Sequence, residues 1–158
     1  MYLYKHKTEW AHDYMLARDS IVSSYGAGLE LQHIGSTAID GLNAKDCIDI
    51  LGVVPSLSII SEKKKSLIDL GYEYRGAYGI EGREYFSKQH KKVHLHIFET
   101  GDFNIIKHLN FVKVMRANPR LIDELNIIKQ RLHIKFPSDK EAYQIGKKYF
   151  YDKLHEMI

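Results

Sequence analysis

The chain is poor in cysteine, in proline and in any excess of one charge. Among 158 residues there are one cysteine (Cys47) and three prolines, and 23 Lys and Arg against 20 Asp and Glu give a formal net charge of +3. A single cysteine excludes an intrachain disulfide and a cysteine zinc cluster. Because the charge excess is small, and no basic stripe or aromatic stacking platform is evident, nucleic acid is not an expected partner.

Long hydrophobic runs are also missing. The longest apolar run is far shorter than a membrane span, and the first residues contain no stretch of signal-peptide length. We therefore expect no membrane partner, and a cytoplasmic location in a reducing compartment. The abundance of Tyr, Ile and Lys is typical of proteins from AT-rich bacterial genomes.

The composition is otherwise that of a globular protein, with 44% hydrophobic and 27% charged residues, and the length favours one domain over residues 1–158. Periodicity predicts helices over residues 9–24, 57–70, 102–117, 120–135 and 139–157, and strands over 29–34, 47–54, 72–75, 83–88 and 93–98. This order predicts an α+β fold, with a small mixed β-sheet packed by helices and a helical C-terminal third. The last predicted helix places Ala142, Ile145, Tyr149 and Leu154 on one face.

The first candidate site is Gly35-Ser36, directly after a predicted strand. Glycine lets the backbone approach a ligand closely, and the amides of this turn, with the Ser36 and Thr37 hydroxyls, can hold a phosphate. A plain strand-ending turn is the alternative interpretation.

Asp49 is the second candidate. Two-residue alternation puts Cys47, Asp49 and Leu51 on one face of the strand and Ile48 and Ile50 on the other. A carboxylate within a buried strand is costly unless it is paired, hydrogen-bonded or metal-bound. Alternatively, Asp49 lies at the hydrated end of the strand, bonded to an amide or to Lys45.

His94 and His96 share one face of another predicted strand, where they could bind a metal or act as acid and base. They could equally be polar positions on a half-exposed strand. Arg83 follows the glycine-rich segment 76–82, so its guanidinium could be delivered to a phosphate. Lys45 could serve the same purpose, and solvated surface charge is the alternative for both.

Together these segments resemble the GrpB family. The signature is carried by His33-Ile34-Gly35-Ser36-Thr37-Ala38, Gly41-Leu42, Ala44-Lys45 and Ile48-Asp49-Ile50-Leu51. Weaker matches are Trp10, Gly82-Arg83 with Phe86, His94-Leu95-His96-Ile97-Phe98-Glu99, His108-Leu109, Phe111, Arg116-Ala117-Asn118-Pro119, Tyr143 and Lys147.

That resemblance implies a nucleotidyltransferase-like, polymerase-β-like core, in which a Gly-Ser turn contacts nucleotide phosphates and an Asp-x-Asp pair binds two divalent metals. By position it implies a nucleotide site of Gly35, Ser36, Thr37, Lys45 and Arg83, catalytic Asp49 and His96, and metal ligands Asp49, His94 and His96. The expected ion is Mg²⁺ or Mn²⁺, with Zn²⁺ as the alternative. Cys47 stands where the first Asp belongs, and Asp46 is out of phase by one residue.

The expected function is therefore binding of a nucleotide or another phosphorylated small molecule at the Gly35-Ser36 turn, with metal-dependent nucleotidyl transfer to an unknown acceptor. Because the first Asp is missing, a non-catalytic accessory domain that binds a nucleotide or a CoA-type ligand is an alternative. A metal-dependent hydrolase with an Asp-His-His site is another. The sequence names no protein partner.

Overall fold

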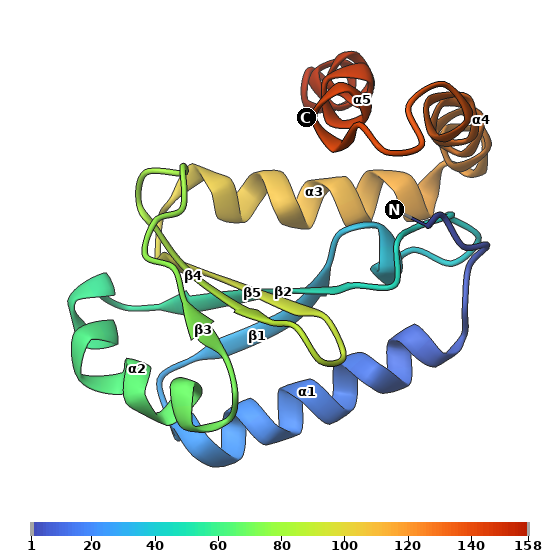
Figure 1. Ribbon diagram of the computed structural model, residues 1–158. Coiled ribbons are helices and arrows are strands. Elements are labelled where there is room, and N and C mark those ends of the chain that lie inside the picture. The colour runs from blue at the N-terminus through green and yellow to red at the C-terminus, as the bar shows by residue number, and fades with distance from the viewer. Residues whose placement is uncertain (1, 158) are drawn as a thin grey trace.

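A mixed β-sheet lies between two layers of helices in the computed structural model, which describes residues 2–157 (Figure 1). The strands are β1 (Glu30–Ile34), β2 (Ile48–Val54), β3 (Glu73–Tyr74), β4 (Arg83–Lys88) and β5 (Val93–Glu99). Their spatial order is β1-β2-β5-β4-β3. The central strands β2 and β5 are parallel, and the other neighbouring strands are antiparallel.

The helices are divided unequally between the two faces of the sheet. The helices are α1 (Glu9–Tyr25), α2 (Ile60–Asp69), α3 (Phe103–Ala117), α4 (Pro119–Lys135) and α5 (Lys140–His155). In Figure 1, α1 and α2 lie on one face, α3 covers the other, and α4 and α5 lie beyond α3. The predicted α+β fold, with a mixed sheet and a helical C-terminal third, is confirmed. None of the helices in residues 2–157 is long and apolar enough to cross a membrane.

Side-chain alternation along the central strands separates two hydrophobic clusters. Ile48 and Ile50 pack with side chains of α1 and α2, whereas Leu51 packs with side chains of α3, α4 and α5. Leu95 belongs to the first cluster as well. Because alternate residues of a strand face opposite sides, Asp49 lies on the face of the sheet that α3 covers. This is the face opposite Ile48 and Ile50, as the sequence predicts.

Local signals account for several helix boundaries. Asp102 caps α3 by accepting a 2.8 Å hydrogen bond from the Asn104 amide, and Asp139 caps α5 through the Ala142 amide at 3.0 Å. Pro119 stands in the first turn of α4, where its missing N–H costs nothing. The predicted starts of α3 and α5, at residues 102 and 139, coincide with the capping aspartates.

The buried face of α5 differs from the predicted one. Tyr143, Lys147, Phe150 and Leu154 are its buried residues. Ile145 and Tyr149, placed with Leu154 by the sequence analysis, are 64% and 79% exposed, so the predicted face is wrong. The pattern was read from apolar residues alone, whereas the buried stripe contains a lysine.

Candidate functional site

The Gly35 turn passes directly over the Asp49 side chain. Gly35 ends β1 with a φ of 74° and a ψ of −170°, a conformation that is essentially restricted to glycine. A Cβ atom at this position would lie 3.0 Å from Asp49 Oδ2. The glycine therefore serves both the backbone conformation and the close approach of the turn to the carboxylate.

Two histidines from the neighbouring strand hold the Asp49 carboxylate. His96 Nε2 lies 3.0 Å and His94 Nδ1 lies 3.6 Å from Oδ1, and strand pairing sets His94 opposite Asp49. Burial opposes ionisation of this carboxyl, but the bonds from His94 and His96 outweigh it and hold the pKa below its usual range. Asp49 is therefore an ionised acceptor that is still 32% exposed.

Arg83 determines which nitrogen of His96 carries the proton. Its Nη1 lies 3.1 Å from His96 Nδ1, and a guanidinium can only donate. His96 Nδ1 must therefore accept, which leaves the proton on Nε2, where it is donated to Asp49. Arg83 also donates to the carbonyls of Ala77 and Tyr78, at 3.1 and 2.9 Å, so it ties the glycine-rich loop to the site.

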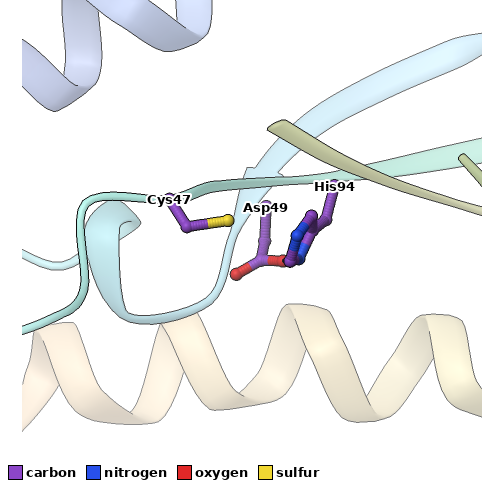
Figure 2. A group of neighbouring side chains, drawn as sticks. All are labelled: Cys47, Asp49 and His94. Atoms are coloured by element: carbon purple, nitrogen blue, oxygen red, sulfur yellow. The ribbon is translucent and has the colours of Figure 1, made fainter. Parts of the chain in front are cut away.

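Cys47 completes a small group of possible metal ligands. One ligand atom each from Cys47, Asp49 and His94 lie within 4.8 Å of one another. Figure 2 shows the sulfur directed toward the carboxylate and the imidazole beside it. Burial, reinforced by the charge of Asp49, raises the pKa of the thiol to about 12. Thiol, carboxylate and imidazole donors together fit Zn²⁺, Mn²⁺ or Fe²⁺ better than Mg²⁺, which prefers oxygen ligands.

Three lysines gather near the Gly35 turn, and we call them the lysine cluster: Lys45, Lys129 and Lys147. Lys129 is only 2% exposed, and its Nζ donates to Ser36 Oγ and to the Asn43 carbonyl, both at 2.7 Å. The Nζ atoms of Lys147 and Lys45 lie 4.8 and 5.3 Å from the centre of the Tyr143 ring.

The lysine cluster is not directly paired with a carboxylate. Within the described part of the chain, none of its members forms an ion pair with a carboxylate. Burial, followed by the neighbouring charge of Lys45, lowers the pKa of Lys147 to about 8. Burial and the charges of Lys147 and Lys45 lower the pKa of Lys129 well below its usual value. The charge of Asp49 opposes these pKa shifts but does not outweigh them. Buried positive charge that is only partly compensated is costly, so this cluster suits an anionic ligand.

The structure brings together most of the residues singled out in the sequence. Gly35 contacts Asp49, Ser36 contacts Lys129, and Lys45 belongs to the lysine cluster. Thr37 instead turns inward, where its hydroxyl lies 2.9 Å from His33 Nε2. The guanidinium of Arg83 likewise donates its hydrogen bonds to His96 and to the glycine-rich loop.

Lys129 was missed by sequence reasoning, and Lys147 was noted only as a match to the family's tail. The available signal was a lysine in phase with a buried stripe, because Lys129 follows the buried Leu125 by one turn and Lys147 follows the buried Tyr143 by one turn. Lysine is rarely buried without a partner, so such a phase points to a specific role.

A surface cavity of about 550 Å³ lies between β1 and α3, apart from these groups. Its lining includes Gln32, His33, Lys113 and Arg116, and none of the lysine cluster or of the possible metal ligands. The chemistry-bearing residues therefore gather beside the Gly35 turn rather than in this cavity.

Comparison with known proteins places these features in a family context. The profile of the GrpB protein family matches residues 1–157. UPF0157 protein YqkA of Bacillus subtilis (strain 168) is 33% identical over 148 residues, which cover 92% of this chain and 43% of YqkA. The chain thus spans less than half the length of that relative.

Solved structures agree with this relationship. The crystal structure of conserved protein GrpB from Enterococcus faecalis superposes with a TM-score of 0.93 at 26% identity, covering 99% of this chain and 96% of that one. Cid1, a poly(U) polymerase solved in complex with the UTP analogue UMPNPP, matches with a TM-score of 0.58 at 10% identity, over 90% of this chain and 48% of Cid1. The latter likeness confirms the nucleotidyltransferase-like fold, and the chain belongs to the GrpB family.

Proposed function

We propose that this protein binds a nucleoside triphosphate through the Gly35-Ser36 turn and the lysine cluster, and transfers the nucleotidyl group to an acceptor in a metal-dependent reaction. The carrying observation is the buried Lys129, which donates to Ser36 Oγ in a cluster with no carboxylate ion pair among the described residues. The structural likeness to Cid1, which binds a UTP analogue, is consistent with the proposal.

The phosphate chain is the part of the ligand that these residues suit best. Lys129 donates to Ser36 Oγ, so the hydroxyl proton of Ser36 can be donated to a phosphate oxygen. Lys147 and Lys45 add positive charge beside the turn, and their attraction is strengthened by partial burial. In the transfer, the acceptor hydroxyl releases its proton to solvent and its oxygen bonds to the α-phosphorus as the bond to pyrophosphate breaks. These lysines would offset the charge on the departing pyrophosphate.

Asp49 would hold the metal, with Cys47, His94 and His96 as the neighbouring candidates. A bound divalent cation would supply charge neutralisation at the reacting phosphate. His96 cannot accept a proton at Nδ1 while Arg83 occupies that nitrogen, and its Nε2 proton faces Asp49. We therefore assign His96 the task of orienting the carboxylate and not that of a general base.

A binding protein without catalytic activity is the second candidate. Asp49 is the only carboxylate among the clustered ligands found in residues 2–157, whereas two-metal catalysis usually draws on several. The same turn and lysine cluster would then recognise a nucleotide or a CoA-type ligand as an accessory domain.

Calorimetric titration with nucleoside triphosphates tests the shared part of both candidates. We expect Lys147→Met to weaken binding about tenfold or more, because it removes a partly buried charge facing the ligand. Lys148→Met is the matched control, since that adjacent side chain is 72% exposed and pairs with Asp152. Absence of any binding to the wild type, with Mg²⁺, Mn²⁺ or Zn²⁺ present, would disprove the proposal.

An acceptor screen with radiolabelled triphosphate separates the two candidates. A labelled product that disappears in Asp49→Ala establishes nucleotidyl transfer. Tight binding without product from any acceptor favours the accessory-domain alternative.

A further inference from the structure

We propose that Cys47, Asp49 and His94 together bind a single divalent cation of the Zn²⁺ class through a thiolate, a carboxylate and an imidazole. The part this ion plays in catalysis rests on the proposed function, whereas its binding depends only on these three side chains. The inference also specifies the ligand set: Cys47 is a ligand that loses its thiol proton to solvent as the metal binds, and His96 supports the site from outside it.

The backbone already brings the three donors to one place. Asp49 lies on β2 opposite His94 on β5, and Cys47 directly precedes β2 with its sulfur directed toward the carboxylate (Figure 2). Their ligand atoms lie within 4.8 Å of one another. Ligands of a tetrahedral zinc ion, each about 2.0–2.3 Å from the metal, are about 3.5 Å apart. The separation to be closed is therefore about 1 Å, which is within the range of side-chain rotations about a fixed backbone.

The chemistry of the donors selects the ion. Thiolate sulfur favours Zn²⁺ and Co²⁺ over Mg²⁺, and imidazole strengthens that preference. Mg²⁺ is usually held by carboxylates and phosphates and keeps several waters, whereas this group offers one carboxylate. The side chains of Asp49 and His94 are 32% and 34% exposed, so an ion can reach them from solvent.

His96 and Arg83 provide the support that metal-bound carboxylates usually have. His96 Nε2 donates to Asp49 Oδ1, and Arg83 fixes the tautomer that makes this donation possible. Such outer hydrogen bonds orient a ligand and raise metal affinity. His96 is therefore a positioning residue for Asp49.

Three protein ligands leave one tetrahedral position open, as in catalytic zinc sites. The Gly35 turn borders the site, because a Cβ at Gly35 would lie 3.0 Å from Asp49 Oδ2. A phosphate oxygen held at this turn is thus near enough to fill the open position. The site and the lysine cluster would then act on two parts of one ligand.

Titration of metal-free protein with Co²⁺, without nucleotide, tests the ligand set directly. We expect an intense near-ultraviolet thiolate-to-cobalt charge-transfer band that saturates at one equivalent and is displaced by Zn²⁺. Cobalt bound without this band, or no cobalt bound at all, would overturn the proposal. Neither result requires a variant to fold.

Substitutions can distinguish the proposed metal ligands from His96, which only supports them. Cys47→Ser should abolish the band and, like His94→Gln, weaken Zn²⁺ more than about 100-fold. His96→Gln should keep the band and weaken Zn²⁺ by roughly 10- to 100-fold. His12→Gln, on the exposed face of α1, is the matched control and should change nothing. Unchanged Zn²⁺ affinity in Cys47→Ser would refute the inference.

Cys47→Asp offers an independent check, since it replaces sulfur with oxygen at the same position. We expect this variant to lose the charge-transfer band and to bind Mn²⁺ more tightly relative to Zn²⁺ than the wild type does. An unchanged preference for Zn²⁺ would contradict a ligand role for Cys47. Because every titration omits nucleotide, failure here leaves the triphosphate-binding proposal standing, and failure of triphosphate binding leaves the metal site standing.

Discussion

Gly35 combines two demands that can be separated by experiment. Its backbone conformation is unfavourable for any residue with a Cβ, and its missing side chain leaves room for Asp49 Oδ2. Gly26 has a similar backbone conformation, with a φ of 86° and a ψ of −157°, but nothing lies within 4 Å of the position a Cβ would take. The two glycines therefore form a matched pair.

We expect Gly35→Ala and Gly26→Ala each to lower the free energy of unfolding by roughly 1–3 kcal/mol, because both force alanine into a glycine conformation. Only Gly35→Ala should also displace the Asp49 carboxylate and weaken Co²⁺ or Zn²⁺ binding. Urea denaturation measures the first effect and metal titration the second. Equal metal affinity in both variants would show that the turn does not control the carboxylate.

Lys147 offers a test of buried charge. Its pKa of about 8, against an ordinary value of 10.5, corresponds to about 3 kcal/mol of unfavourable burial when it is charged. The unfolded chain binds more protons between pH 8 and 10.5, so this cost is complete below pH 8 and fades as the pH rises through that window.

We therefore expect Lys147→Met to raise the free energy of unfolding at pH 7 by up to about 3 kcal/mol, less whatever its contacts with Tyr143 and Tyr151 contribute. The advantage of the variant should shrink between pH 7 and 9.5. Lys148→Met is the control and should lie within about 0.5 kcal/mol of the wild type at both pH values. A constant difference across this range would mean that Lys147 is not the titrating group.

Among the secondary-structure elements, the central strands were predicted best from the sequence. Alternation alone assigned Asp49, His94 and His96 to their faces, because a strand has only two faces and its apolar residues mark one of them. The pairing of the strands could not be predicted from the sequence, because β2 pairs with β5 although a helix and two strands separate them along the chain. The convergence of Asp49 with the histidines therefore rested on family resemblance.

Helix α5 shows why Lys129 and Lys147 were not predicted alongside Lys45. A helix has a continuous range of faces, and its apolar residues do not define the buried one when polar groups are buried with them. Ile145 and Tyr149 are exposed while Lys147 is buried. Lys129 and Lys147 meet only because α4 and α5 pack side by side, which no local pattern records.

Arg83 connects the glycine-rich loop between β3 and β4 to the site. Arg83 donates to the carbonyls of Ala77 and Tyr78 and is 8% exposed. We expect Arg83→Met to increase amide exchange across residues 76–82 and to lower the free energy of unfolding by roughly 1–3 kcal/mol, because the loop carbonyls and His96 all lose the donor that the buried guanidinium provides. Hydrogen–deuterium exchange measured by mass spectrometry reports the first effect.

Arg18→Met is the matched control for that change, since Arg18 pairs with Asp19 on the exposed surface of α1. It should leave exchange in residues 76–82 at the wild-type level. If Arg83→Met leaves this exchange unchanged as well, the loop is held by other contacts, and the link from the loop to His96 is not supported.

Across the molecule, the two halves of the site come from different layers. The metal ligands belong to the sheet and its approach, the lysine cluster comes mainly from α4 and α5, and the Gly35 turn lies between them. Ligand binding should therefore couple the C-terminal helices to the sheet. Because the pKa of Lys147 is lowered, ligand binding should be accompanied by a proton uptake that can be measured.

At pH 8, free Lys147 is about half protonated, because burial lowers its pKa to about 8. A bound phosphate chain favours the charged lysine, so binding should take up roughly half a proton at this pH. For the same reason, affinity should fall as the pH rises from 8 toward 10. Calorimetry of triphosphate binding in two buffers of different ionisation enthalpy measures the uptake. Lys147→Met should reduce it, with any remainder coming from Lys129 and Lys45, whose pKa values are also lowered, while Lys148→Met preserves it. Proton uptake as large in Lys147→Met as in the wild type would assign the linkage to another group and place Lys147 outside the phosphate site.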